Sequence, residues 1–248
     1  MKSPEVDLTI LSDNVPAKRG LRTAWGYSCL VRRGNTALLF DTGSDGKVLL
    51  HNMARLGVDP AVIPFVFISH EHWDHVGGVP ALLQENRKAK FFLPAASDLP
   101  PVDLNGHPSR RIRKFEEILP GFYSTGSLAS PVVEQSLVVR APEGLIVITG
   151  CAHPGIASIV ETVHKALPKE TLALVMGGFH LKSESEATIR RIIARLRELG
   201  VEYVAPSHCS GDLARKLFQQ EWKEAFLPVG CGSRIRAGDS IELRESGR

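Results

Sequence analysis

The chain of 248 residues has little of what marks membrane, secreted or nucleic-acid-binding proteins. It has no apolar run near the ~20 residues of a membrane-spanning helix, and residues 1–10 lack the apolar stretch of a signal peptide. Its 4 cysteines form no CxxC pair, and its formal net charge is only +3. The sequence therefore predicts a cytoplasmic protein with reduced thiols that binds neither membranes nor nucleic acid, and it leaves the oligomeric state open.

The apolar content is sufficient for a full hydrophobic core. Hydrophobic residues make up 43% of the chain and charged residues 23%, which excludes disorder as the main state. No linker-like segment divides the chain. We therefore predict a single domain over residues 1–248, with an irregular substrate-loop region at about 94–135 that contains at most short strands.

Short β-like runs alternate with amphipathic helical patterns, which is typical of an α/β protein. We expect helices from a Ser44 cap through Leu56, at 79–86, at 156–167, at 184–199 with Ser183 and Glu186 as a capping box, and from Asp212. We expect strands at 8–11, 27–32, 36–40, 62–68, 90–93, 137–140, 145–149, 172–176 and 201–205, and a closing strand pair in the tail.

A dense polar motif follows the apolar run 62–68, and it reads HEHWDH over residues 70–75. His70 and His72 are two residues apart, so on an extended segment they point the same way, whereas Glu71 points away. Asp74 and His75 lie on the next turn, where they can face a second metal ion. Imidazoles and a carboxylate at this density indicate a divalent metal site.

Three further histidines each follow an apolar strand in a turn of small residues. They are His153 in TGCAHPG, His180 in GGFHL and His208 in PSHCSG. In a layered α/β fold such turns gather at one edge of the sheets. We predict His153 and His208 as metal ligands, and His180 as either a ligand or a substrate contact.

Four motifs resemble, in order, those of the metallo-β-lactamase superfamily: FDTG (40–43), SHEHWDH (69–75), CAHPG (151–155) and PSHCSG (206–211). The resemblance implies a four-layer αβ/βα sandwich, with two mixed sheets between helices and two divalent metal ions at one sheet edge. It assigns His70, His72 and His153 to the first ion, and Asp74, His75 and His208 to the second. Asp41 would be the buried aspartate that holds a ligand histidine. Zinc is the expected metal, with iron or manganese as alternatives.

One departure from the superfamily pattern concerns the bridging aspartate that many of its hydrolases carry after a later strand. Gly178 stands at that place in VMGGFHL. Without that carboxylate, we expect ions that lie farther apart, one weakly held ion, or a contribution from His180.

Longer segments resemble a subgroup, the 7,8-dihydropterin-6-methyl-4-(β-D-ribofuranosyl)aminobenzene-5′-phosphate synthase-like proteins. These segments are 13–31, 38–60, 149–156, 177–181 and 206–211. The resemblance implies an enzyme that joins a pterin-methyl diphosphate to an arylamine, and more generally one that acts on a phosphorylated or diphosphate-bearing small molecule.

Asp74 and His180 are the catalytic candidates of the site, and the synthase hypothesis adds residues that would bind its substrate. A basic cluster, Arg110, Arg111, Arg113 and Lys114, would hold the anionic substrate, unless it is only a solvated loop. Trp25 or Trp73 would stack on the pterin ring, unless they pack in the core. Cys209 reads as a small buried residue.

Two other functions stay open. The first is a metal-dependent hydrolase of a phosphoester, thioester or lactone, in which Asp74 would orient water. The second is a non-catalytic binding module that metal stabilises.

Overall fold

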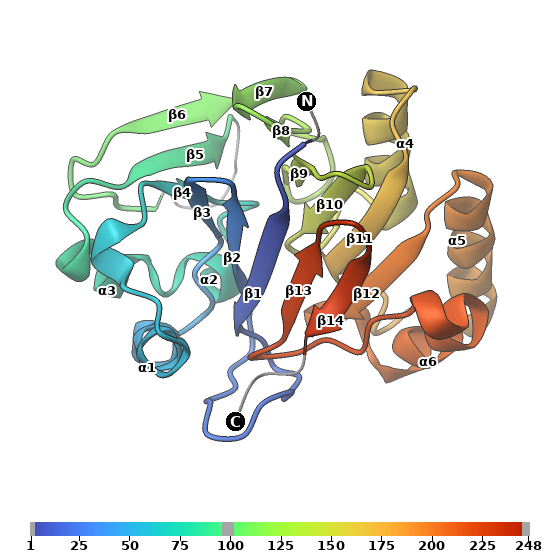
Figure 1. Ribbon diagram of the computed structural model, residues 1–248, viewed down its shortest axis with the longest axis horizontal. Coiled ribbons are helices and arrows are strands. Elements are labelled where there is room, and N and C mark those ends of the chain that lie inside the picture. Colours follow the sequence, from blue (N-terminus) through green and yellow to red (C-terminus); the bar gives the residue numbers. More distant parts are fainter. Residues whose placement is uncertain (1–2, 96–101, 245–248) are drawn as a thin grey trace.

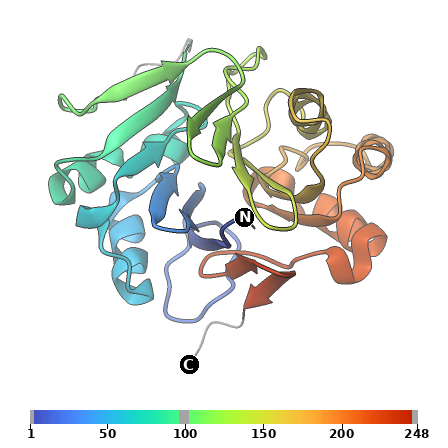
Figure 2. The same ribbon diagram turned by 45° about the horizontal axis from the view of Figure 1, so that its top comes forward.

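The computed structural model describes residues 3–95 and 102–244. Two β-sheets pack face to face, and helices cover the outer face of each sheet (Figures 1 and 2). The αβ/βα sandwich expected from the sequence is therefore confirmed.

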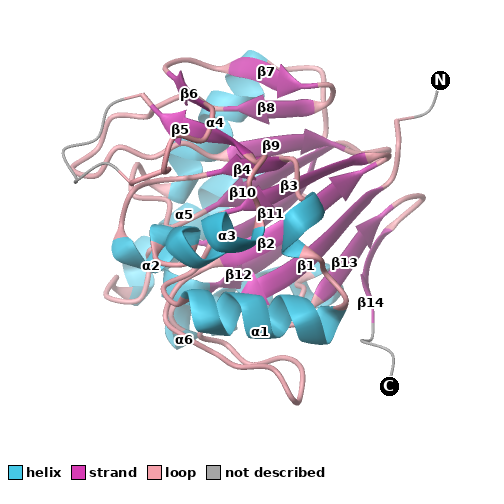
Figure 3. Cartoon of the chain, turned by 90° about the vertical axis from the view of Figure 1, so that its left-hand side faces the viewer, coloured by secondary structure: helices cyan, strands magenta, loops and turns pink. Residues whose placement is uncertain are grey.

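The first sheet has eight strands in the order β14-β13-β1-β2-β3-β4-β5-β6. They are β1 (Val6–Ser12), β2 (Ser28–Arg33), β3 (Thr36–Phe40), β4 (Phe65–Phe67), β5 (Lys90–Pro94), β6 (Ser109–Ile112), β13 (Arg234–Ala237) and β14 (Ile241–Arg244). Helices α1 (Gly46–Leu56) and α3 (Val79–Glu85) lie on its outer face (Figure 3).

The second sheet has six strands in the order β12-β11-β10-β9-β8-β7. They are β7 (Glu116–Leu119), β8 (Phe122–Ser124), β9 (Leu137–Arg140), β10 (Leu145–Thr149), β11 (Leu172–Gly178) and β12 (Tyr203–Ser207). Helices α4 (Ile156–Ala166), α5 (Glu186–Glu198) and α6 (Asp212–Trp222) cover it. Within residues 3–95 and 102–244, none of the helices is both long enough and apolar enough to cross a membrane.

Alternation along the strands divides the apolar residues among three cores. Leu38 and Phe40 of β3 point into the core between the sheets, whereas Leu39 packs beneath α1 and α3. Met176 of β11 likewise joins the central core, and its neighbour Val175 packs against α4, α5 and α6. The central strands are therefore apolar on both faces, which is why they read as continuous hydrophobic runs.

Parallel pairing brings several strand ends to one edge of the sandwich. In the first sheet β3 runs parallel to β4, and in the second β10, β11 and β12 run parallel. The segments after these strands carry Asp41, His70, His153, His180 and His208.

Helix starts and one strand differ from the sequence expectation. Asp45 rather than Ser44 caps α1, because the first helical residue is Gly46 and the Asp45 carboxylate accepts the Lys47 N–H at 2.7 Å. α5 begins two residues later than expected, so its cap is Ser185 rather than Ser183. β4 covers only Phe65–Phe67, because residues 60–62 form a 3₁₀ turn before it.

Candidate metal centre

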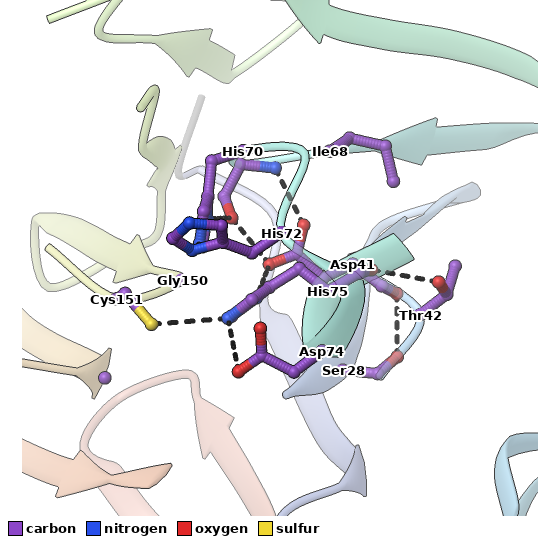
Figure 4. Close-up of polar contacts among 12 residues, drawn as sticks. Ser28, Asp41, Thr42, Ile68, His70, His72, Asp74, His75, Gly150 and Cys151 are labelled. Carbon is purple, nitrogen blue, oxygen red and sulfur yellow. Dashed lines mark hydrogen bonds and ion pairs between the residues drawn. The ribbon is translucent and has the colours of Figure 1, made fainter. Parts of the chain in front are cut away.

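The first wall of the site is the segment 69–75, which follows β4 and ends in the short helix α2 (Trp73–Val76). His70 is fully buried and His72 is half-buried. His70 Nε2 lies 3.1 Å from His72 Nδ1. α2 directs the side chains of Asp74 and His75 into the same space (Figure 4).

Asp41, which follows β3, holds this wall in place. One carboxylate oxygen accepts the Ser69 N–H at 2.7 Å, and the other accepts the Ser69 hydroxyl at 2.7 Å and pairs with His75 Nδ1 at 2.8 Å. The Ser69 hydroxyl in turn lies 2.9 Å from His70 Nδ1. These contacts leave the Nε2 atoms of His70 and His75 directed at the interior of the site.

The second wall is the segment 150–153, which follows β10. The buried carboxylate of Glu134 accepts the backbone N–H groups of Gly150, Cys151 and Ala152 at 3.0–3.1 Å, and that of His153 at 2.8 Å. One side chain therefore fixes the backbone that carries both Cys151 and His153.

His208, which follows β12, and His180, which follows β11, form the rest of the site. His208 lies in a 3₁₀ turn, and its Nδ1 contacts the Asn14 side chain at 2.9 Å, which turns Nε2 inward. His180 is exposed, and its ring lies 4.5 Å from that of His153, so it sits at the rim.

The structure thus brings all six predicted ligands together. His75 Nε2 and His208 Nε2 lie 3.6 and 3.4 Å from Asp74 Oδ2. The His153 ring lies 4.9 Å from that of His70 and 5.0 Å from that of His72.

This donor set fits a divalent metal. His153 Nε2 is buried and has no hydrogen-bond partner within residues 3–95 and 102–244, which is costly for a polar atom. Metal–nitrogen bonds of about 2.0–2.3 Å place neighbouring ligand atoms of a tetrahedron about 3.3–3.7 Å apart. The distances from Asp74 Oδ2 fall in this range, so the histidines and Asp74 are suited to hold an ion.

Burial and neighbouring charges shift the pKa values of the ionisable groups in the site in different directions. Burial lowers the pKa of His70 well below its usual value and that of His153 to about 4, so both rings are neutral and able to coordinate. Burial also opposes a charge on His75, but Asp41 and Asp74 outweigh it and raise that pKa to about 9. Burial acts to raise the pKa of Asp74, but the His208 and His75 rings hold it at about 2.

Backbone strain is concentrated at the same edge. Asp41, Ala152, His180 and His208 have φ between 50 and 60°. Residues other than glycine rarely adopt this region, because it costs about 1–3 kcal/mol for each residue. Strain of this kind gathers at functional sites because the fold must hold side chains in set directions.

A pocket of about 360 Å³ opens onto the histidines, and the side chains of Trp25, Trp73 and His180 help to line it. Both tryptophans are exposed, at 38% for Trp25 and 63% for Trp73, so the alternative that they pack in the core is wrong. The Trp25 ring lies 5.1 Å from that of His208.

The basic cluster lies elsewhere, on and after the edge strand β6. Arg110 pairs with Glu116, and Arg111 lies 3.5 Å from Glu71, which faces away from the ligand nitrogens as expected. None of the cluster lines the pocket at the histidines. Its role in binding substrate stays a prediction.

Gly178 cannot be replaced by an aspartate without a rearrangement. A Cβ atom there would lie 2.2 Å from Gly150 O and 2.7 Å from Cys209 Sγ. An aspartate side chain at this place therefore has no room in the structure as it stands.

Sequence reasoning missed three residues that shape the site: Glu134, Asn14 and Cys151. Glu134 and Asn14 are single polar residues in loops, far along the chain from the groups they hold, so no local pattern marks them. Cys151 lies two residues before the predicted ligand His153, in the motif TGCAHPG. This motif is the signal that could have identified Cys151 as a candidate metal ligand, since sulfur is a common zinc ligand.

Comparison with known proteins agrees with this geometry. The family model of the metallo-beta-lactamase superfamily matches residues 26–208, and the chain belongs to that superfamily. Among solved structures, Tm1679, described as a metal-dependent hydrolase of the beta-lactamase superfamily, is 30% identical with a TM-score of 0.79, over 92% of this chain and 98% of that one.

Two further comparisons bear on the subgroup and the fold. The 7,8-dihydropterin-6-methyl-4-(beta-D-ribofuranosyl)-aminobenzene-5′-phosphate synthase of Methanocaldococcus jannaschii is 26% identical, over 80% of this chain and 84% of its own. YhfI from Bacillus subtilis, a metallo-beta-lactamase fold protein, is 14% identical with a TM-score of 0.70, over 94% of this chain and all of its own, and it shows the fold alone.

Proposed function

We propose that the protein is a two-metal enzyme that transfers a ring-bearing methylene group from a diphosphate ester to an amine. The observation that carries this proposal is a pocket next to the metal centre that is lined by the Trp25 ring and by two cationic side chains, Lys182 and Arg215. The similarity to the M. jannaschii synthase supports the same class of substrate.

This second pocket has a volume of about 410 Å³ and shares Trp25 and His208 with the first. Lys182 Nζ lies 4.8 Å from the centre of the Trp25 ring. Arg215 also lines this pocket, and its buried Nε has no hydrogen-bond partner in the part of the chain that the structure describes. A flat ring over Trp25, with a phosphate near these cations, satisfies both features.

The ligands divide as the family motifs imply. His70, His72 and His153 would hold one ion, and Asp74, His75 and His208 the other. The nitrogen-rich set favours zinc. When bound, divalent ions supply charge neutralisation for a departing diphosphate.

The chain's own residues would then bind and orient the reactants. Lys182 and Arg215 bind the diphosphate, and Trp25 positions the ring. The methylene C–O bond breaks, and its electron pair leaves with the diphosphate. The amine nitrogen forms the new C–N bond, and its proton passes to His180 at the rim, while Asp74 orients the reacting groups.

The test is product formation from a pterin-methyl diphosphate and a 4-(β-D-ribofuranosyl)aminobenzene phosphate, followed by mass spectrometry on metal-loaded protein. We expect a coupled product and free diphosphate, and a loss of most activity in Lys182→Ala and Trp25→Ala at unchanged metal content. Lys165→Ala, an exposed lysine on α4, is the matched control. Coupling that survives both pocket substitutions would overturn the proposed binding mode.

Hydrolysis is the second candidate, because Tm1679 is described as a metal-dependent hydrolase. In this case water replaces the amine, and Asp74 orients it. Metal-dependent turnover of a generic phosphodiester, thioester or lactone without any coupling would favour this candidate. A fully metal-loaded protein that acts on none of these substrates would favour a binding module instead.

A further inference from the structure

The side chain of Cys151 occupies the middle of the metal centre. It is only 4% exposed, and its Sγ lies 3.3 Å from His75 Nε2 and 3.5 Å from His208 Nε2. Figure 4 shows the sulfur directed from the second wall toward His75 and Asp74. A cysteine that served only as packing would face apolar atoms rather than two imidazole nitrogens.

Its distances are those of a ligand shell. The Nε2 atoms of His75 and His208 each lie near both Cys151 Sγ and Asp74 Oδ2. The four distances from these nitrogens to the sulfur and the oxygen are 3.3–3.6 Å. Zinc–sulfur bonds of ~2.3 Å and zinc–nitrogen bonds of ~2.0 Å give edges of about 3.5 Å in a tetrahedron. Cys151 therefore completes a four-ligand set with Asp74, His75 and His208.

The same sulfur also belongs to the other half of the site. The ligand atoms of His70, Cys151 and His153 all lie within 4.8 Å of one another, as do those of Asp74, His75, Cys151 and His208. Cys151 is the one residue common to these two groups. It therefore has the position of a ligand shared by two ions.

Two features of the surroundings support that role. The Gly178 backbone is too close to Gly150 to admit a bridging aspartate from β11. Glu134 meanwhile fixes the backbone N–H of Cys151 at 3.0 Å, so the sulfur is held in place by a buried carboxylate. The fold thus excludes an aspartate carboxylate at Gly178 and holds a thiol that can become a thiolate at Cys151.

We propose that the Cys151 thiolate is a metal ligand shared by the two ions, in the place of the bridging carboxylate that the chain lacks. On binding, the S–H bond breaks, its proton goes to solvent, and the sulfur lone pairs coordinate the metal without any redox change. Cys151 and Asp74 are then the two anionic ligands of the centre, and sulfur favours zinc over manganese. This inference rests on the metal centre of the proposed function.

Cobalt(II) loading tests the assignment without any assay of activity. Cobalt(II) reports its own binding through visible ligand-field bands, and a thiolate ligand adds an intense near-ultraviolet charge-transfer band. We expect both signals in the wild type. We expect the near-ultraviolet band to disappear in Cys151→Ser and Cys151→Ala, while circular dichroism shows a folded protein.

Two other cysteines provide matched controls. Cys29 lies in the central core on β2, and Cys209 lies beside the site, with its Sγ 3.7 Å from Cys151 O. We expect Cys29→Ala and Cys209→Ala to retain the charge-transfer band. Zinc affinity of Cys151→Ser should fall by more than the ~10–100-fold that loss of a supporting residue costs.

The outcomes separate this inference from the metal centre itself. In the wild type, ligand-field bands without the charge-transfer band would overturn the role of Cys151 and leave the histidine site intact. A charge-transfer band that disappears in Cys209→Ala but persists in Cys151→Ser would move the ligand to Cys209. Wild-type protein that binds no cobalt or zinc would overturn both proposals.

Discussion

The two walls of the metal centre are held in different ways. In the first wall, residues 69–75, Asp41 contacts the side chains of Ser69 and His75 and so orients imidazole rings directly. In the second wall, residues 150–153, the Glu134 carboxylate accepts four backbone N–H groups. The first wall is thus specified by its side chains and the second by its backbone, and both depend on one buried carboxylate.

The largest effect should come from the ligands of the first wall. His72→Ala and Asp74→Ala each remove a donor, so we expect metal content to fall by about one ion per chain and activity to fall with it. The measurement is elemental analysis beside the coupling assay, with His51→Ala on α1 as the control. A His72→Ala protein that keeps two ions and full activity would show that the ligand assignment is wrong.

The next largest effect concerns the support of that wall. In Asp41→Asn the amide group faces a hydrogen-bond donor, so the arrangement of Ser69 and His75 loosens. We expect metal affinity to fall by about 10–100-fold and the free energy of unfolding by about 1–3 kcal/mol. Competitive metal titration and urea denaturation measure these quantities. Unchanged metal affinity would remove Asp41 from the account.

The second wall should respond to Glu134→Gln. The new amide group cannot accept all four N–H groups, so the segment carrying Cys151 and His153 shifts. We expect a loss of about 1–3 kcal/mol in stability and about a 10-fold loss in metal affinity. Glu161→Gln, on the surface of α4, is the matched control.

A cobalt spectrum sharpens the contrast between the walls. At saturating cobalt(II), Asp41→Asn should keep the thiolate band, and Glu134→Gln should weaken it. An equal loss of that band in both variants would contradict the separation of the two walls.

The smallest effect on metal should come from the rim. His180 is exposed and lies beside His153 rather than between the ligand nitrogens. We expect His180→Ala to keep both ions while activity falls by about 100-fold, the lower end for a side chain that transfers a proton. Metal analysis and steady-state rates on one preparation check this, and unchanged rates would remove His180 from the reaction.

The sequence predicted the first wall better than the second for a physical reason. The ligands at 70–75 are close in sequence, so strand and turn geometry alone place them together. The fold followed from the apolar runs of strands covered on both faces and from the stripes of the helices. The segment 94–135 has no such pattern, and Glu134 lies at its end.

The remaining parts of the site depend on contacts between distant segments. Asn14 meets His208 across 194 residues, and Glu134 meets His153 across 19. Nothing near Asn14 or Glu134 in the sequence shows which group each will hold. The exposure of Trp25 and Trp73 was likewise hidden, because an aromatic residue in a loop looks the same whether it packs or faces a pocket.

The proposed metal centre holds two ions without a bridging aspartate. Elemental analysis of protein purified without added metal, normalised per chain, is the decisive test. We expect about two divalent ions per chain, mainly zinc. A value of one or none from protein that is folded, and that takes up no further metal on titration, would contradict it.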